Sequence, residues 1–269
     1  MDIGGFCGLR GVESLKITTW NVNGLRAAAR KGFWEHLEAV DPDVLLLQEV
    51  RARPEQLSLE LREPDGWHVY WNPADRPGYS GTAIWSRYPI SLHAVQLGGR
   101  HVDNEGRLIE ATTGGVRVAC VYLPSGSSGP ERQAVKDRWL VLFRRWLDKR
   151  RTVEPLIFGG DINVAHTERD IFHAKSNEQT SGFLPHEREW FGGLLDSGWH
   201  DLVREYHGAV AGPYSWWSNR GRARELDRGW RIDYLICNAA LRPRFRGAEI
   251  CRAAALEVSD HAPVSVVLE

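Results

Sequence analysis

Polar side chains stand in or at the ends of several apolar segments of the chain. They are Asn21, Asn23, Glu49, Asp161, Asn163, Asp233, Asp260 and His261. Carboxylates and amides at strand ends can converge on one edge of an α/β fold. Together they offer oxygen ligands that suit Mg²⁺, Mn²⁺ or Ca²⁺ better than zinc, with one imidazole beside them. These residues alone predict a metal-assisted hydrolase.

Asp233 differs from the other polar residues because it lies inside an apolar segment, 232–237. A buried carboxylate costs free energy unless it is paired. His261 is its natural partner, because a carboxylate that accepts from one ring nitrogen fixes the tautomer of the imidazole and stabilises the imidazolium. A turn or a cap is the competing interpretation for each of the Asn and Asp residues at strand ends.

Short apolar runs predict the strands that must position these side chains. They span 16–22, 44–50, 68–72, 82–86, 108–112, 117–123, 156–160, 232–237 and 264–268. Gly114 and Gly115 lie between two of these runs and predict a hairpin. Strands outnumber helices, and hairpins mix with crossovers. This pattern favours two packed sheets with helices outside rather than one parallel sheet.

Two longer segments have helical spacing. Apolar residues recur every three or four positions over 131–151, and a second helix is expected over 186–196, with Pro185 near its start. The basic residues of the first helix are expected on the side away from the apolar face. They are Arg132, Lys136, Arg145 and Lys149.

The composition is that of a folded protein of 269 residues, 42 % of them hydrophobic and 26 % charged. We find no linker and no repeat, so we expect one domain over 16–269 after a flexible glycine-rich tail, 1–15. No apolar run approaches the about 18 residues of a membrane helix, and the first residues lack the pattern of a secretory signal. We therefore expect a cytoplasmic protein without membrane contact.

The charge and the cysteines exclude some classes of protein. Four cysteines without C-x-x-C spacing disfavour a zinc site or a redox pair, and a net charge of −1 disfavours a strongly basic nucleic-acid-binding protein. One segment is nevertheless locally basic, and it could bind backbone phosphates without reading bases. Its residues are Arg220, Arg222, Arg224 and Arg228. A solvated protein surface is the competing interpretation of this segment.

Seven blocks of the sequence resemble, in order, the exonuclease III family of apurinic/apyrimidinic (AP) endonucleases, within the endonuclease/exonuclease/phosphatase superfamily. They are TWNVNGLR (19–26), LLLQEV (45–50), GYSGTAIWSR (78–87), GGDINVAH (159–166), SGFLPHEREW (181–190), GWRIDYLI (229–236) and SDHAPV (259–264). The resemblance runs from about Lys16 to the C-terminus. The segments 181–190 and 215–234 resemble the DNA-repair branch specifically.

The resemblance implies a fold and an activity. The fold is a four-layer α/β sandwich, in which two mostly antiparallel or mixed sheets pack face to face between helices. The activity is Mg²⁺-dependent hydrolysis, with Mn²⁺ as a substitute, of the phosphodiester 5′ to abasic sites in duplex DNA, which leaves a 3′-hydroxyl. A 3′-phosphodiesterase, 3′-phosphatase or 3′→5′ exonuclease activity on DNA 3′ ends, blocked ends included, is also implied. The alternatives are a superfamily phosphatase or nuclease with another substrate, and a catalytically weak protein that binds abasic DNA. We expect a monomer.

The same resemblance implies roles for the polar residues. Glu49 is implied as the principal metal ligand, with Asn21 and Asp260 as lesser or water-mediated ones. Asp161 is implied to orient or deprotonate the attacking water, and Asn163 to hold that water or a phosphate oxygen.

Further roles concern the phosphate and the sugar. His261, oriented by Asp233, is implied to donate to the scissile phosphate, and Tyr122 to hydrogen-bond the phosphate or assist the leaving group. Three residues are implied to form the walls of a pocket for a flipped-out abasic sugar, which costs less to extrude than a normal nucleotide. They are Trp216, Trp230 and Ile232. Filling of the core is the competing interpretation for Trp216 and Trp217.

Three positions depart from the pattern of the family. Ser125 stands where Asn is common, so that a phosphate-contacting amide is absent or replaced by a hydroxyl. Asn23 stands where some relatives carry Asp, which reduces the negative charge near the metal. Arg51 stands where Lys is frequent.

Overall fold

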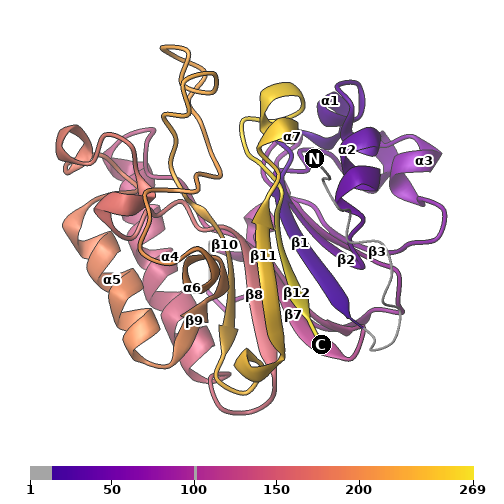
Figure 1. Cartoon of the computed structure of the whole chain (residues 1–269). Helices are drawn as coiled ribbons and strands as arrows, with labels where there is room; N and C mark the ends of the chain where they lie inside the picture. The colour runs from indigo at the N-terminus through magenta and orange to yellow at the C-terminus, as the bar shows by residue number, and fades with distance from the viewer. Residues whose placement is uncertain (1–13, 100–101) are drawn as a thin grey trace, which may run out of the picture.

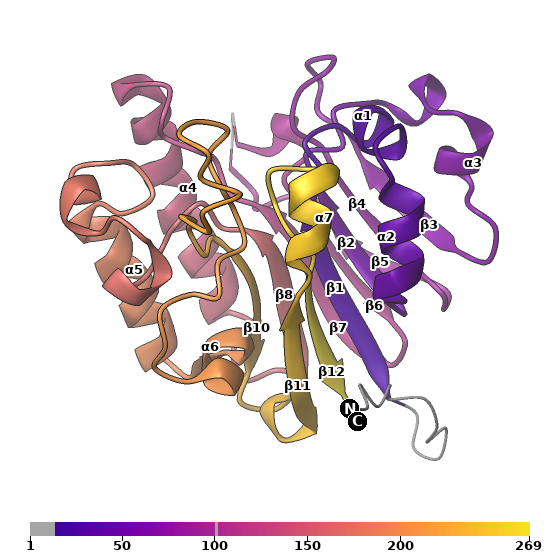
Figure 2. The ribbon, with the colours of Figure 1, turned by 45° about the horizontal axis from the view of Figure 1, so that its top comes forward.

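The computed structural model describes residues 14–99 and 102–269. They form two six-stranded sheets that pack face to face, with helices on the outer faces of both (Figure 1, Figure 2). The first sheet has the order β11 (Phe245–Ile250), β12 (Val264–Leu268), β1 (Leu15–Asn21), β2 (Val44–Gln48), β4 (Thr82–Ser86), β3 (His68–Asn72). The second has the order β5 (Ser91–Ala94), β6 (Leu108–Thr113), β7 (Val116–Tyr122), β8 (Leu156–Asp161), β10 (Asp233–Asn238), β9 (Trp199–Asp201). The predicted α/β sandwich is confirmed.

Helices complete the layers on both sides. The α-helices are α1 (Leu25–Ala29), α2 (Phe33–Val40), α3 (Leu59–Arg62), α4 (Pro130–Asp148), α5 (Pro185–Asp196), α6 (Leu202–His207) and α7 (Arg252–Glu257). Short 3₁₀ helices are η1 (Pro54–Gln56), η2 (Asp103–Glu105), η3 (Glu168–Asp170), η4 (Lys175–Asn177) and η5 (Arg242–Arg244). No α-helix of the described ranges is both long and apolar enough to cross a membrane.

The central strands are buried on both faces, and alternate side chains point to different cores. In β2, Val44 and Leu46 lie in the core between the two sheets, whereas Leu45 and Leu47 pack under the helices outside the first sheet. The outer face of the second sheet is covered in the same way by α4 and α5. Because both faces are covered, the central strands read as continuous apolar runs rather than alternating ones.

The strand directions explain where the polar residues meet. β1 runs parallel to β2, and β7 runs parallel to β8, so the carboxyl ends of each pair lie side by side. Tyr122 pairs with Asp161 at the end of β7 and β8, and Asp233 at the start of β10 pairs with Asp161 from the other side. One edge of the sandwich therefore receives functional side chains from both sheets.

The predicted strands are all present, but short elements were missed. β5, β9 and β11 lie at the edges of their sheets. Most side chains of β5 and β11 are at least partly exposed, and β9 has only three residues, so none of the three carries a clear apolar pattern. Leu15, which we expected in the tail, belongs to β1, and residues 1–13 of that tail lie outside the described residues. Cys120 and Cys237 are buried, free thiols, and burial raises the pKa of each to about 12.

One prediction about α4 is wrong. Lys136 is fully buried rather than on the solvent side of the helix. Its position is three and four residues before Trp139 and Leu140, so it lies on the same buried stripe as these apolar residues. The helix spans Pro130–Asp148 instead of 131–151. The helical period thus agrees with burial of this residue, whereas its charge had suggested exposure.

Candidate active site

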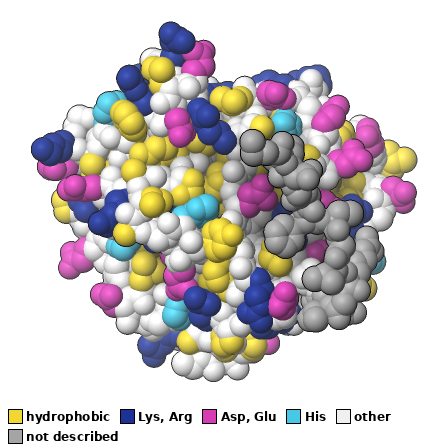
Figure 3. Space-filling model, viewed as in Figure 1, with side chains coloured by type: hydrophobic (Ala, Val, Ile, Leu, Met, Phe, Trp, Pro, Cys, Tyr) yellow, Lys and Arg dark blue, Asp and Glu magenta, His cyan; other side chains and the backbone are white. Residues whose placement is uncertain are grey.

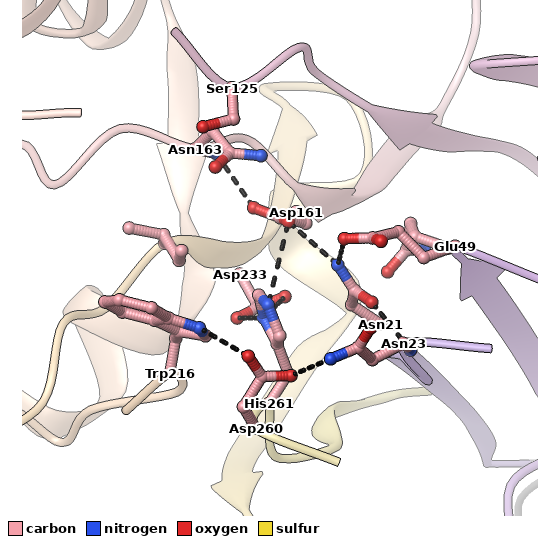
Figure 4. Close-up of polar contacts among 12 residues, drawn as sticks. Asn21, Asn23, Glu49, Ser125, Asp161, Asn163, Trp216, Asp233, Asp260 and His261 are labelled. Atoms are coloured by element: carbon pink, nitrogen blue, oxygen red, sulfur yellow. Dashed lines mark hydrogen bonds and ion pairs between the residues drawn. The ribbon is translucent and has the colours of Figure 1, made fainter. Parts of the chain in front are cut away.

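Asn21 connects the carboxyl ends of strands from the two sheets. Its Nδ2 atom donates to Glu49 Oε1 and to Asp161 Oδ2, at 2.9 Å in each case (Figure 4). Asn21 ends β1 of the first sheet, Glu49 follows β2, and Asp161 ends β8 of the second sheet. A single buried amide thus holds two carboxylates close together at the edge of the sandwich.

The backbone turns sharply after β2 to present Glu49. Glu49 and Arg51 both have left-handed φ values, 52° in each case, which is uncommon for residues with a Cβ. Hydrogen bonds hold this turn in place, because Val50 N donates to Gly81 O and Arg51 N donates to Ser80 O. Backbone strain of this kind costs about 1–3 kcal/mol per residue and is concentrated at functional sites.

The charge of Glu49 is stabilised by its neighbours. Burial by itself would raise the pKa of Glu49, but the Arg51 guanidinium and hydrogen bonds from Asn21 and Tyr122 outweigh burial and lower it. Arg51 Nε donates to Glu49 Oε2 at 2.9 Å. Glu49 is therefore ionised at neutral pH, as a ligand of a hard cation must be.

Asp161 has the opposite electrostatic situation. It is buried, and burial together with the nearby Asp233 and Glu49 raises its pKa, although His261 opposes this shift. Asn163 N donates to Asp161 Oδ1 at 3.0 Å and so orients the carboxylate. A carboxylate with a raised pKa is a stronger proton acceptor than an ordinary Asp, which suits a general base.

His261 lies between two carboxylates. Its Nδ1 atom is 2.9 Å from Asp233 Oδ2, and its Nε2 atom is 3.9 Å from Asp161 Oδ2. Burial would lower the pKa of His261, but Asp233 and Asp161 raise it to about 10. The ring is therefore an imidazolium at neutral pH, and its Nε2–H is directed toward the side of Asp161.

Ser215 contacts Asp233 in this site, and the sequence did not indicate it. Its hydroxyl donates to Asp233 Oδ2 at 2.7 Å and accepts from the backbone N–H groups of Ile232 and Asp233. Asp233 thus receives a second hydrogen bond besides that of His261. The only signal in the sequence is the position of Ser215 directly before Trp216, and a serine there has many other uses.

The residues at the strand ends fit a hard divalent cation. Glu49, Asp161 and His261 each offer a ligand atom within 4.8 Å of the others, and the repulsion between Glu49 and Asp161 would be relieved by a cation. Because His261 is protonated, the carboxylates are the better ligands, whereas Asn21 turns its Nδ2 toward both of them and its Oδ1 accepts from Asn23 N at 3.0 Å. This donor set is oxygen-rich, as Mg²⁺ and Mn²⁺ require.

Asp260 does not face this carboxylate pair. Its Oδ1 accepts from Asn23 Nδ2 at 2.8 Å, and its Oδ2 accepts from Trp216 Nε1 at 3.1 Å (Figure 4). Both hydrogen bonds and the neighbouring His261 lower the pKa of Asp260 against the effect of its burial. The structure therefore places Asp260 where it joins the end of β1 to the Trp216 side chain.

The expected pocket residues lie together beside His261. The rings of Trp216 and Trp230 meet edge to face with 6.0 Å between centroids, and the Trp216 ring is 6.3 Å from that of His261. Both tryptophans are partly exposed, and they pack against buried Ile232. Trp217, by contrast, is 1 % exposed and fills the core, as the competing interpretation held for that residue.

The side chain of Arg107 packs against Tyr122. The Arg107 guanidinium lies 4.3 Å from the centroid of the Tyr122 ring and donates to Tyr122 O at 3.0 Å. Burial and the carboxylates of Glu49 and Asp161 raise the pKa of Tyr122 well above its usual value. The phenol is therefore protonated and can donate a hydrogen bond.

The predicted basic segment forms part of a loop between α6 and β10 that projects from the molecule (Figure 1). Figure 3 shows basic side chains at the tip of this projection. Arg220, Arg222 and Arg228 are exposed, but Arg222 pairs with Glu225, and Arg228 lies over the Phe172 ring. Arg224 is only partly exposed.

A second basic area was missed by the sequence analysis. A cavity of about 410 Å³ adjoins the turn after β2, and its lining includes Asn23, Arg26, Arg30 and Arg51. Arg26 and Arg30 lie on and directly after α1, which was not predicted as a helix. Ser125, at the departure from the family pattern, lies near Asn163 and bonds Ser127 within its own loop (Figure 4).

A comparison with protein families matches residues 18–261 to the model of the endonuclease/exonuclease/phosphatase family. Among curated proteins, the chain is 37 % identical to an exodeoxyribonuclease of Bacillus subtilis, over 94 % of this chain and 99 % of that protein. It is 35 % identical to the DNA repair nuclease APEX1 of Danio rerio, over 95 % of this chain and 82 % of that protein.

Among solved structures, one of the most similar is that of a 3′ phosphatase, NExo, from Neisseria, bound to a product DNA hairpin. It superposes with a TM-score of 0.85 at 30 % identity, and the alignment covers 95 % of this chain and 99 % of that chain. The likeness therefore extends over nearly the whole length of both proteins.

Proposed function

The chain belongs to the endonuclease/exonuclease/phosphatase family, in the branch of the exonuclease III-like AP endonucleases, and on that premise we propose that it hydrolyses the phosphodiester 5′ to abasic sites in duplex DNA. It is a DNA-repair nuclease, and the product would carry a 3′-hydroxyl. The observation that supports this substrate is the apolar pair Trp216 and Trp230 directly beside His261. A pocket of that kind accepts a sugar without a base and rejects an intact nucleotide by its size.

Glu49 would hold the divalent metal ion, which we propose to be Mg²⁺, with Mn²⁺ as a substitute. Asn21, whose Oδ1 accepts from Asn23 N at 3.0 Å, would be a lesser or water-mediated ligand. When bound, this ion supplies positive charge that neutralises a phosphate oxygen and stabilises the leaving alkoxide. Arg51 and Asn21 keep Glu49 ionised and oriented for this role. Asp260, whose two oxygens are engaged by Asn23 and Trp216, would act through water at most.

The protein side chains perform the proton transfer and stabilise the charge. Asp161, with its raised pKa, would take a proton from the attacking water, which Asn163 helps to hold. The imidazolium of His261 would donate from Nε2 to a phosphate oxygen as negative charge builds there, while Asp233 and Ser215 keep the ring in place. Tyr122, whose phenol donates to Glu49 in this structure, would redirect this hydrogen bond to the same phosphate.

Removal of groups from DNA 3′ ends is a second activity of the same site. The similarity to the Neisseria 3′ phosphatase supports it. Each of these reactions attacks phosphorus beside a 3′ oxygen, so the same residues can serve all of them. We propose 3′-phosphatase, 3′-phosphodiesterase or 3′→5′ exonuclease activity in addition to incision, carried out by a monomer in the cytoplasm.

An end-labelled duplex that carries one tetrahydrofuran abasic analogue tests the proposal. We expect cleavage 5′ to the analogue in Mg²⁺ and none in EDTA. Tetrahydrofuran resists β-elimination, so a lyase would not form the same product. Digestion of an undamaged control from its 3′ end would add the exonuclease. Binding without cleavage would instead indicate a damage-binding protein, and the absence of both would indicate a phosphatase or nuclease with another substrate.

A further inference from the structure

Lys136 and Glu187 form a fully buried ion pair between the two helices that cover the second sheet. Lys136 Nζ in α4 is 2.6 Å from Glu187 Oε1 in α5, and both side chains are 0 % exposed. Burial of two charges is expensive, and the replacement of such a pair by apolar residues is often neutral or stabilising. Stability therefore gives no reason for the pair, whereas its other contacts do.

Lys136 contacts the loop that follows β8. Its Nζ atom donates to Asn163 O at 2.8 Å. Asn163 has a left-handed φ of 54°, its backbone N–H binds Asp161, and its side chain donates to Leu123 O at 2.9 Å. The ammonium group of Lys136 thus fixes the strained backbone at Asn163. Asn163 and its hydrogen-bond partner Asp161 are the two residues assigned to the attacking water.

Glu187 contacts the turn that packs on the pocket wall. Its Oε2 accepts from Gly182 N at 2.6 Å and from Leu184 N at 3.1 Å. The turn leaves no room at Gly182, where a Cβ would lie 3.1 Å from Asn163 O and 3.1 Å from Trp230 Cζ3. The turn therefore fills the space between the Asn163 loop and the Trp230 ring.

A third segment rests on the same pair through Gln133. Gln133 Nε2 donates to Glu187 Oε1 at 3.0 Å. On its other side the Gln133 amide packs directly against Gly126, where a Cβ would overlap Gln133 Oε1. The segment that carries Ser125 therefore contacts this ion pair through Gln133.

We propose that the Lys136–Glu187 pair is a positioning element that holds the Asn163 loop at a fixed distance from the Trp230 wall of the pocket. This inference rests on the proposed function, because it assigns the attacking water to the Asn163 loop and the abasic sugar to the Trp230 ring, on the two sides of the Gly182 turn. Neither residue touches substrate. A misplacement of about 1 Å between reacting groups can cost about 10²-fold in rate, so a remote pair of this kind affects turnover.

The double variant K136M/E187Q tests the proposal. The amide introduced by E187Q keeps an acceptor for Gly182 N, no unpaired charge is buried, and the contact from Lys136 to Asn163 O is lost. On the tetrahydrofuran duplex in Mg²⁺ we expect kcat to fall about 10²-fold with little change in KM, while the melting temperature stays close to that of the wild type. A change in stability alone would not produce this separation of kcat from KM.

The variant R150M/E110Q is the matched control. It removes the contacts of Glu110 in β6, whose side chain is 0 % exposed and which pairs with Arg150, two residues after the end of α4, and with Arg117. These residues touch none of the site segments. We expect wild-type kcat. Wild-type kcat in folded K136M/E187Q, or an equal loss in the control, would overturn the inference.

Two further measurements extend the test. The first does not use the double variant, and the second does not depend on activity. G182A forces a Cβ into the junction and should lower kcat in the same way, and wild-type kcat there would count against the inference. The ¹⁹F resonance of Trp230 in protein labelled with 5-fluorotryptophan should move in K136M/E187Q and stay unchanged in R150M/E110Q. An unmoved resonance would refute the positioning role even if the wild-type protein failed to cut abasic DNA, a result that would reject the proposed function separately.

Discussion

At the scale of single residues, the neighbours of each site residue set its charge. Glu49 and Asp161 are carboxylates held by the same amide, yet Arg51 lowers the pKa of Glu49, whereas burial and nearby carboxylates raise that of Asp161. Two carboxyl groups with opposite shifts indicate two different roles. This difference supports the assignment of Glu49 to the cation and of Asp161 to the water.

Glu49→Gln should remove the charge that binds the cation while the shape of the side chain is kept. We expect turnover on abasic DNA to fall at least about 10²-fold at low Mg²⁺ and to recover in part at high Mg²⁺. Direct titration with Mn²⁺, followed by electron paramagnetic resonance, should show weaker binding. Wild-type rates at every Mg²⁺ concentration would refute the assignment as a ligand.

Asp233→Asn should change the pH dependence through His261. Asp233 is one of the groups that raise the pKa of His261 to about 10, so its loss should move this pKa toward the ordinary value near 6.5. The alkaline limb of the pH–rate profile should then shift to lower pH, because the imidazolium of His261 loses its proton at a lower pH. An NMR titration of the His261 ring in the metal-free protein checks the shift. Equal pKa values in the two proteins would contradict the role of Asp233.

At the scale of elements, a buried network of charges anchors the pocket wall to its surroundings. Arg231 is fully buried between Trp230 and Ile232, and it pairs with Asp170 and Asp201 at 2.7 and 2.8 Å. Asp170 ends η3, which follows β8 after a short loop, and Asp201 ends β9. The neighbours of Arg231, Trp230 and Ile232, are therefore anchored to η3 and β9, two elements that carry none of the residues assigned to the reaction.

Asp170→Asn should destabilise the protein by about 3 kcal/mol at pH 7, because it leaves the buried Arg231 with less compensating charge. Burial would raise the pKa of Asp170, but Arg231 and Arg204 lower it well below its usual value. A lowered pKa in the folded state stabilises the protein above the unfolded pKa near 3.9 and loses this effect as the pH falls. The difference from wild type should therefore shrink in urea unfolding at pH 3. Equal unfolding free energies at pH 7 would contradict the prediction.

At the scale of the whole molecule, positive charge is local rather than general. The formal net charge is −1, yet arginines gather around the cavity at α1 and on the loop before β10. Because only charge near the bound phosphates attracts DNA strongly, a nearly neutral protein can still bind it.

The variant R26Q/R30Q should therefore weaken binding to abasic and undamaged duplexes alike. We expect the slope of log K against log salt to become shallower by about one for each arginine that contacts a phosphate. Fluorescence anisotropy over a series of salt concentrations measures this slope. Arg144→Gln on the outer side of α4 is the control, and an unchanged slope in R26Q/R30Q would exclude phosphate contacts at this cavity.

Much of this organisation could be read from the sequence. The central strands are apolar because each sheet packs on the other sheet with one face and under helices with the other. The residues at the carboxyl ends of the parallel strands share one edge with Asp233 and His261, which lie at or just before the starts of antiparallel strands. Asn21, Glu49, Asp161 and His261 therefore stood out by position and type alone. The order of the family blocks indicated the substrate class as well.

The tertiary structure decided what touches what. Lysine usually lies at the surface, but Lys136 is buried in α4 and pairs with Glu187 of α5, which is far away in the sequence. Asp260 follows the pattern of a metal ligand, yet Asn23 and Trp216 occupy its oxygens. Partners of this kind come from segments far apart in the chain, and their contacts depend on how the layers pack. Local sequence patterns report the period and the burial of a segment, but not the side chain that will face it.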